Sequence, residues 1–137
     1  MSGETDLNKL LATMRPELRG GIYVFVTVPS NTTVPGGLEA VMSLREDEGL
    51  TMIVPERAAL AAGITGVFPC HMITVMVHSA LDAVGFLATI TTRLAAAGIG
   101  VNLVSAFFHD HLFVPAGQTE EVVEILRRLA ADVKPKG

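Results

Sequence analysis

One pattern of elements occurs twice along this chain, and it restricts the folds that the chain can adopt. In residues 51–58 (TMIVPERA) an apolar strand ends in Val-Pro and is followed by a helical segment. The same order returns in residues 111–118 (HLFVPAGQ). Each strand follows a polar turn, at residues 45–49 (REDEG) and 107–111 (FFHDH). This repetition predicts two related halves, each with a hairpin that leads into a helix.

The second half has the clearer pattern and reads β-α-β-β-α. Apolar residues at helical spacing predict a helix over residues 79–99, with Ser79 and Asp82 as candidate N-caps and Gly98 at its end. The other expected elements are a strand over 71–78, a strand over 100–108, a turn at 109–111, a strand over 112–114 and a helix over 117–133.

The first half reads α-β-loop-β-β-α. A loop over residues 29–37, rich in Pro, Gly and Asn, stands where the second half has its long helix. The other expected elements are a helix over 5–20 capped by Thr5 or Asp6, strands over 21–30, 38–46 and 50–55, and a helix over 56–64 ended by Gly63. We therefore predict an α+β fold with two tandem halves, antiparallel sheets and helices packed on one face.

The composition indicates a folded chain that does not cross a membrane. Half of the 137 residues are hydrophobic and 18% are charged. No apolar run reaches the roughly 18–20 residues that a membrane span requires. The strands over 21–30 and 71–78 are apolar on both faces, which one layer of helices cannot cover. We therefore expect a homodimer or a higher homo-oligomer.

Charge and cysteine content restrict the classes of binding partner and the cellular compartment that we expect. The formal net charge is −4, and the ten Lys and Arg residues are scattered apart from the pair Arg127–Arg128, so we expect no nucleic-acid partner. The N-terminal residues lack the pattern of a secretory signal. Cys70 is the single cysteine, which excludes an intrachain disulfide. These features indicate a cytoplasmic protein without a membrane partner.

The stretch HDH at residues 109–111 contains the residue types of a metal site. His109 and His111 are two residues apart, which would place both on one face of a strand. A structural metal site needs about four ligands and a catalytic one about three. The remaining candidates in the sequence are Asp110, His71, His78 and Cys70. Because so few ligands are local, we expect a solvated hairpin tip, with no metal and no other cofactor.

The sequence offers no catalytic motif. Cys70 and His71 are adjacent, so on a strand they point to opposite faces and cannot form a nucleophile–base pair. Cys70 fits a small buried apolar residue, and the acidic residues 46–48 fit a charged turn. We find no phosphate-binding loop, dinucleotide fingerprint or nucleophile elbow. We therefore expect a protein that is not an enzyme. The alternative, a metal-dependent enzyme that uses His109 and His111, would require bound metal.

Residues 78–107 (HSALDAVGFLATITTRLAAAGIGVNLVSAF) resemble the ACT domain, a small ligand-binding regulatory module. The resemblance consists of a strand, a loop of the type Asp-x-x-Gly at Asp82 to Gly85, a helix that ends at residues 94–99, and a strand that contains Asn102. From Gly21 onward the chain also resembles small stand-alone bacterial proteins that hold two ACT-like halves. These are relatives of the CASTOR-type amino-acid sensors.

The resemblance implies a fold, a division of the chain and a class of function. The implied fold is the ferredoxin-like βαββαβ plan, and the implied halves are a degenerate ACT-like half at 1–66 and an ACT domain at 67–137. Ligand binding at a domain or subunit interface is implied, without catalysis. One departure is Val84, where ACT domains often have proline. We expect a non-catalytic regulatory or sensor protein whose small-molecule ligand is an amino acid.

Physical chemistry supports a ligand at the start of the helix. A helix that begins near residues 82–84 presents free N–H groups and the positive end of its dipole, which suit a carboxylate. Gly85 allows a ligand to approach the backbone, and the Asn102 amide can both donate and accept. The expected ligand-binding residues are Asp82, Ala83, Val84, Gly85, Phe86, Leu87 and Asn102.

The same residues also permit a structural interpretation. Gly85 would then serve only close packing of the helix on the sheet, and Asn102 only the connection from helix to strand. The alternative function is therefore a protein-interaction or assembly module in which the ligand loop is vestigial. The sequence does not identify a partner enzyme.

Overall fold

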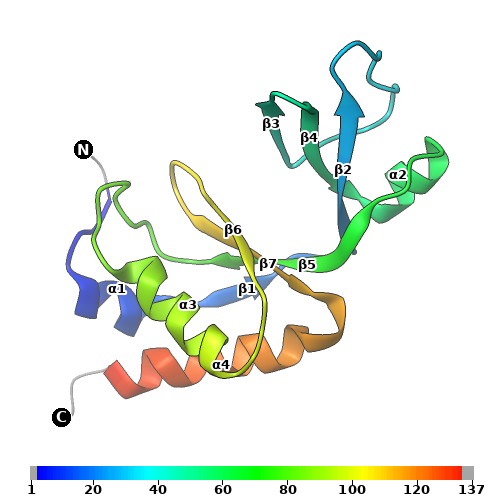
Figure 1. Cartoon of the computed structure of the whole chain (residues 1–137). Helices are drawn as coiled ribbons and strands as arrows, with labels where there is room; N and C mark the ends of the chain where they lie inside the picture. Colours follow the sequence, from blue (N-terminus) through cyan, green and yellow to red (C-terminus); the bar gives the residue numbers. More distant parts are fainter. Residues whose placement is uncertain (1–2, 134–137) are drawn as a thin grey trace. The chain divides into compact units, whose positions relative to one another are not determined.

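The computed structural model describes residues 3–133 (Figure 1). The chain divides into two compact units, which we call the inserted unit and the terminal unit. The inserted unit is Gly20–Cys70, and the terminal unit combines Met1–Arg19 with His71–Gly137. The inserted unit therefore interrupts the terminal unit in sequence. The division of the sequence between residues 66 and 67 stays a prediction.

The strands of the terminal unit follow the order β1-β5-β7-β6. These strands are β1 (Pro16–Leu18), the second part of β5 (Val67–Val75), β6 (Asn102–Ser105) and β7 (Asp110–Pro115). The pairs β1–β5 and β6–β7 are antiparallel. The helices are α1 (Leu7–Thr13), α3 (Phe86–Ala96), the short 3-10 helix η1 (Ala116–Gln118) and α4 (Thr119–Val133). The order β5-α3-β6-β7-α4, with β1 as the remaining strand, confirms the predicted ferredoxin-like plan.

The helices of the terminal unit pack on one face of its sheet, as predicted, and lie below the strands in Figure 1. Leu11 of α1, Ile90 of α3 and Leu126 of α4 belong to one apolar cluster. Ile73 of β5 and Leu112 of β7 complete this cluster from the sheet, and each of the two is fully buried. Burial of these side chains is the main stabilising term of the unit.

The inserted unit is a smaller antiparallel arrangement with the strand order β3-β4-β2-β5. Its elements are β2 (Tyr23–Pro29), β3 (Met42–Glu46), β4 (Gly49–Pro55), α2 (Glu56–Ala61) and the first part of β5. Val24, Val26 and Val54 form its core with Ala59 of α2. Residues 30–37 form neither helix nor strand, as the Pro and Gly content predicted, and the strand expected from residue 38 begins only at Met42.

The repeat predicted from the two Val-Pro motifs is present in the structure. Residues 51–60 and residues 111–120 show the same succession of buried, half-buried and exposed positions. Both segments consist of a strand that ends in Val-Pro and a helical turn directly after it. The two units therefore use one hairpin-to-helix design, and the α+β class with two tandem halves is confirmed.

The predicted bounds of two elements of the terminal unit, the first helix and strand β5, were wrong. The helix expected over 5–20 ends at Thr13, although Asp6 caps it as expected by accepting the Lys9 N–H at 3.0 Å. Pro16 cannot continue a helix and disfavours helical geometry at the residue before it. Residues 16–18 instead pair with β5. Strand β5 also begins at Val67 rather than at residue 71.

The predicted positions of the helix start and of the hairpin turn in the second half were also wrong. Helix α3 begins at Phe86, not near residue 79, because Gly85 has a left-handed backbone (φ +89°) through which a helix cannot continue. Neither Ser79 nor Asp82 caps it. The turn between β6 and β7 lies at residues 106–109, where the Ala106 N–H donates to the His109 carbonyl at 3.0 Å. Asp110 and His111 therefore belong to a strand.

Within residues 3–133, no helix has the length and apolar character that crossing a membrane requires.

Candidate functional site

A small cavity of about 130 Å³ lies in the terminal unit at the start of α3. It is bounded by the loop that joins β5 to α3, by the first turn of α3, and by the adjoining ends of β6 and β7. The lining residues are Ser79, Ala80, Leu81, Ala83, Gly85, Phe86, Leu87, Ala88, Ser105 and Asp110.

The first turn of α3 supplies hydrogen-bond donors to this cavity. Gly85 is the N-cap residue and has no side chain that could satisfy the first amides of the helix. Among the described residues, the amides of Phe86, Leu87 and Ala88 have no backbone or side-chain acceptor. Free amides at a helix N-terminus, together with the helix dipole, favour an anionic group.

Asp110 supplies an anionic group to the same cavity. It is the first residue of β7, it is 5% exposed, and its Oδ2 accepts a hydrogen bond from the Ser79 hydroxyl at 3.0 Å. No cation within residues 3–133 forms an ion pair with it. A buried carboxylate without a paired charge is unusual, because removing a charge from water is costly. Among the described residues, the cavity therefore contains a carboxylate that forms no ion pair.

Strand register explains why Asp110 faces this cavity. Successive residues of a strand alternate between its faces, so Asp110 shares the helix side of β7 with Leu112 and Val114, which lie in the core. Ser105 pairs with Asp110 across the hairpin and lies on the same side. The hairpin turn therefore places one hydroxyl and one carboxylate at the edge of the cavity.

The predicted ligand-binding residues are only partly brought together. Ala83, Gly85, Phe86 and Leu87 line the cavity, whereas the exposed Asp82 and Val84 do not. Asn102 lies at the other end of β6 from Ser105. It pairs with Phe113, on the face of the sheet opposite the helices. The structure therefore does not bring Asn102 to the cavity.

Sequence reasoning missed three polar residues of the cavity, Ser79, Ser105 and Asp110. Two of them, Ser79 and Asp110, are among the few buried polar residues of the chain. The signal for Asp110 was present in the HDH stretch, but assigning that stretch to the hairpin tip made the carboxylate look solvated. If we had predicted the turn at residues 106–109 instead of 109–111, Asp110 would have been placed in the strand, on the side that faces the core.

The loop beside the cavity is held by the N-terminal segment. The Glu4 N–H donates to the His78 carbonyl at 2.8 Å, and the Ala80 N–H donates to the Glu4 carbonyl at 2.9 Å. Gly3 approaches so closely that a Cβ there would lie 2.6 Å from the Ala80 nitrogen. These contacts fix the backbone on which Ser79 sits.

His109 lies in the hairpin turn, whereas His111 belongs to β7 and His71 to β5. His111 Nδ1 is 3.0 Å from the Thr74 hydroxyl, and that hydroxyl also accepts from Arg19 Nε at 3.0 Å. Burial lowers the pKa of His111, and the nearby His109 and Arg19 lower it further. No group of three or more His, Cys, Asp or Glu side chains in the described part of the chain could hold a metal ion.

Cys70 is a buried residue of the inserted unit. Its Sγ donates to the Tyr23 carbonyl at 3.3 Å, and burial raises the pKa of the thiol to about 11. Since the thiolate is the reactive form of cysteine, this thiol is a poor nucleophile. The interpretation of Cys70 as a small buried apolar residue is confirmed.

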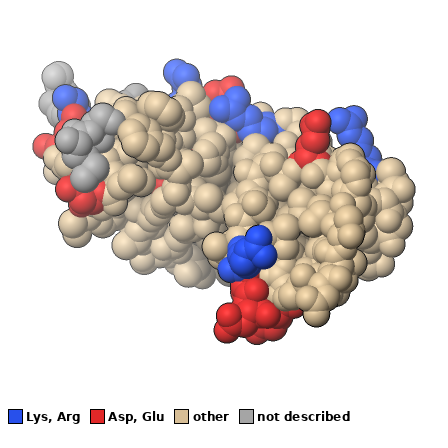
Figure 2. All heavy atoms as spheres, turned by 90° about the horizontal axis from the view of Figure 1, so that it is seen from above, with Lys and Arg blue, Asp and Glu red and all other residues tan. Residues whose placement is uncertain are grey.

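Charged side chains do not form a continuous surface on the face shown in Figure 2. Lys and Arg occur there in separate small groups, with neutral side chains between them.

Several solved structures are similar to this chain. A protein of unknown function from Vibrio cholerae, described as a possible transport protein, is 37% identical. It aligns over 94% of this chain and 99% of its own length, with a TM-score of 0.81. A protein from Agrobacterium tumefaciens is 21% identical over 85% of this chain and 89% of its own, with a TM-score of 0.71.

The fold is also shared with a regulatory subunit. The regulatory subunit of aspartate kinase from Thermus flavus is 10% identical and aligns over 86% of this chain and 98% of its own, with a TM-score of 0.60. This likeness concerns the fold. The comparison with curated proteins found no match.

Two family models match the sequence, and both describe ACT domains. One covers residues 2–71 and the other covers residues 67–128. ACT domains are regulatory modules and not catalytic ones, and they generally bind small molecules. Together the two models span most of the chain, and the resemblance stated from the Asp-x-x-Gly loop is confirmed. The chain therefore belongs to the ACT domain family.

Proposed function

We propose that this protein is a non-catalytic, cytoplasmic regulator that binds a free amino acid in the cavity at the start of α3. Membership of a regulatory family supports the class of function. The shared fold with an aspartate kinase regulatory subunit is consistent with it. The observation that carries the ligand assignment is Asp110, a buried carboxylate without a described counter-ion in a cavity that also holds free helix amides.

The two polar groups of the cavity match the two charges of an amino acid. The free amides of Phe86, Leu87 and Ala88 would receive the ligand carboxylate. Asp110 would receive the ammonium group through a charge-assisted hydrogen bond, and the Ser79 hydroxyl would hold the Asp110 carboxylate in position. A ligand that carried only one of the two charges would leave one of these groups without a partner.

The cavity would enclose only part of a ligand. Its volume of about 130 Å³ is below the roughly 300–1,000 Å³ of pockets that enclose drug-sized molecules. The common amino and carboxylate groups of an amino acid are small enough to occupy it. We propose that the rest of the ligand lies at an interface, within a homodimer or a higher homo-oligomer.

Calorimetric titration with each of the twenty amino acids tests the proposal. We expect at least one to bind, and Asp110→Asn to weaken that binding by about 10- to 150-fold, the cost of losing a hydrogen bond to a charged group. Asn102→Ala is the matched control, because Asn102 lies on the neighbouring strand but faces away from the cavity. Equal affinity of wild type and Asp110→Asn would contradict the proposed site.

A second candidate function is an assembly module whose loop no longer binds a ligand. The observation that favours it is the number of large apolar side chains that are more than half exposed, such as Leu81 and Val84. If no amino acid bound, and light scattering gave a mass above the 14.5 kDa of one chain, this function would replace the first. A monomeric mass at micromolar concentration would contradict the proposed oligomer.

A further inference from the structure

We infer that the ligand of this cavity is an amino acid with a large apolar side chain. The inference rests on the proposed function and adds the class of side chain. It is drawn from four exposed residues, Leu81, Val84, Phe107 and Phe108, which we call the apolar rim.

Leu81 of the apolar rim lines the cavity, and the other three rim residues stand beside lining residues or between them in the sequence. Leu81 lines the cavity and is nevertheless 59% exposed, so the cavity wall reaches the surface there. Val84 is 84% exposed and stands between the lining residues Ala83 and Gly85. A ligand held by its amino and carboxylate groups would therefore extend its side chain past these residues.

The hairpin turn supplies the aromatic part of the apolar rim. Phe107 and Phe108 are 62% and 59% exposed, and they lie in the turn between Ser105 and Asp110, which both line the cavity. Exposed aromatic rings in contact with one another are a recurring feature of binding surfaces. The turn thus links the two polar residues of the cavity to two exposed rings.

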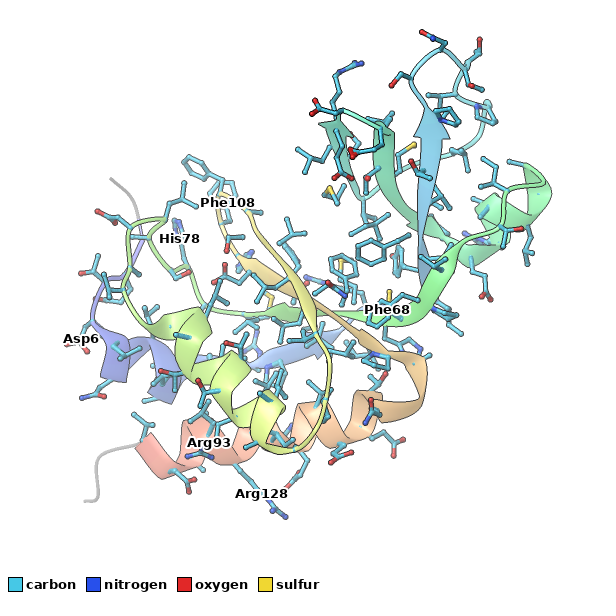
Figure 3. All side chains as sticks on the ribbon, in the orientation of Figure 1. Asp6, Phe68, His78, Arg93, Phe108 and Arg128 are labelled. Atoms are coloured by element: carbon cyan, nitrogen blue, oxygen red, sulfur yellow. The ribbon has the colours of Figure 1, made fainter. Side chains whose placement is uncertain are left out.

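The rings are already arranged before any ligand binds. Phe107 and Phe108 meet edge to face, with ring centroids 4.8 Å apart. Phe108 lies beside His78, at 5.4 Å between centroids, as Figure 3 shows. His78 precedes Ser79, and its carbonyl accepts from the Glu4 N–H. A surface that is ordered in this way loses little conformational entropy when a ligand side chain packs on it.

The charges near the apolar rim oppose an acidic ligand side chain. Among residues 79–92, Asp82 is the charged residue, and it does not line the cavity. Asp110 would already be paired with the ligand ammonium group. A second carboxylate on the ligand would therefore meet two acidic residues and no described Lys or Arg in the cavity wall.

A titration panel of Gly, Ala, Leu, Phe, Lys and Glu tests the inference on the full chain. Each methylene that becomes buried raises affinity by about fourfold, so Leu and Phe should bind at least tenfold more tightly than Ala. Lys and Glu should bind more weakly than Leu. Equal affinity for Ala, Lys and Leu would overturn the inference and leave the amino-acid proposal intact.

Two variants separate recognition by the apolar rim from other effects. Phe107→Ser should weaken Leu and Phe binding by about tenfold and leave Ala binding unchanged, because Ala cannot reach the ring. Leu44→Ser is the matched control, since Leu44 is 60% exposed on β3 of the inserted unit. It should change none of the affinities.

Two results with Phe107→Ser would contradict the apolar rim. An equal loss of Ala and Leu affinity in Phe107→Ser would assign Phe107 to the site as a whole. A change in oligomer mass on Phe107→Ser, with unchanged selectivity, would make the rim a contact between copies of the chain. Failure of every amino acid to bind wild type would instead defeat the proposed function itself.

Discussion

The two units use the same hairpin but differ in the residue at one core-facing position. In the inserted unit, Leu50 pairs with Arg45 across the β3–β4 hairpin and packs against the core. In the terminal unit, Asp110 occupies the same place in the repeat and pairs with Ser105. One hairpin therefore presents an apolar side chain to its helix side, and the other presents a carboxylate.

The two units also differ in the segment that follows the corresponding strands, β5 in the terminal unit and β2 in the inserted unit. After β5 the terminal unit has a loop and the 11-residue helix α3, whose first amides are free. After β2 the inserted unit has residues 30–41, which contain no helix and hence no helix N-terminus. The comparison shows that both units keep the same pattern of buried residues in the hairpin strand and the helix after it. The polar groups that we propose to bind an amino acid lie in the terminal unit.

The largest expected effect concerns the helices that follow the two Val-Pro motifs. Leu126 of α4 is fully buried, whereas Leu60 of α2 is 71% exposed. Leu126→Ala should lower the free energy of unfolding by about 2–5 kcal/mol, and Leu60→Ala by less than about 0.5 kcal/mol. Urea denaturation of both variants measures the difference. Equal losses would mean that the two side chains contribute equally to packing, which would contradict the difference in burial between α4 and α2.

Exchanging the residues that distinguish the two hairpins should destabilise the protein more at Leu50 than at Asp110. Leu50→Asp places an unpaired carboxylate on a core-facing position and should cost about 1–3 kcal/mol of unfolding free energy. Asp110→Leu removes an unpaired carboxylate and should leave stability within about 1 kcal/mol of wild type, since it also removes the hydrogen bond from Ser79. Chemical denaturation of each variant is the test. A loss above about 2 kcal/mol for Asp110→Leu would assign Asp110 a structural role.

A smaller effect is expected at the glycines with left-handed backbone next to α3 and α2. Gly85 has φ +89°, and a Cβ there would contact the Leu7 side chain at 3.4 Å. Gly63 has φ +70° in open space. Alanine at either position should cost about 1–2 kcal/mol, with the larger loss at Gly85. Thermal unfolding compares the two, and Gly63→Asn is the control because Asn tolerates this backbone. Unchanged stability of Gly85→Ala would contradict the assigned conformation.

The smallest expected effect is a pH dependence confined to the terminal unit, which holds all four histidines. The pKa of His111 is lowered by burial, with His109 and Arg19 adding to the shift and Asp110 opposing it. The unfolded chain therefore binds a proton more readily than the folded chain. Stability is complete above the unfolded pKa of about 6.5 and falls as pH decreases from there toward the lowered folded pKa.

Urea denaturation at pH 7.5 and pH 5.5 measures this dependence. Wild type should be less stable at the lower pH, and His111→Gln should show a smaller difference, because Gln keeps a partner for Thr74 without titrating. An identical pH difference in the two proteins would exclude His111 as its source.

The element order could be predicted from sequence because it rests on local patterns. The strand at Tyr23–Pro29, the loop after it, the helix stop at Gly98 and the terminal helix are each specified by side chains close in sequence. The ACT assignment followed from the Asp-x-x-Gly loop. Strand β1 could not be predicted, because three residues become a strand only through pairing with β5, which is distant in sequence.

The candidate site was less predictable because it depends on register. Four of the seven predicted residues line the cavity, since they belong to one continuous loop and helix turn. Asp110 was missed because the hairpin turn was predicted too late in the sequence, and Asn102 was included from the ACT-like pattern without regard to the face of the strand that it occupies. Shifting a hairpin turn by a few residues reverses which side chains face the helices, and composition alone does not fix that turn.

The interruption of the terminal unit by the inserted unit has a consequence for synthesis of the chain. Pro16 of β1 pairs with Val75 of β5, and α1 packs in a cluster with α3 and α4. Helix α1 and strand β1 therefore leave the ribosome before the elements that bury them, and they cannot be buried until β5, α3 and α4 have emerged. The inserted unit has all its strands once Cys70 has emerged. We expect it to gain protection first in hydrogen-exchange measurements on chains of increasing length, while Leu10 and Leu11 stay accessible to chaperones until α4 is complete.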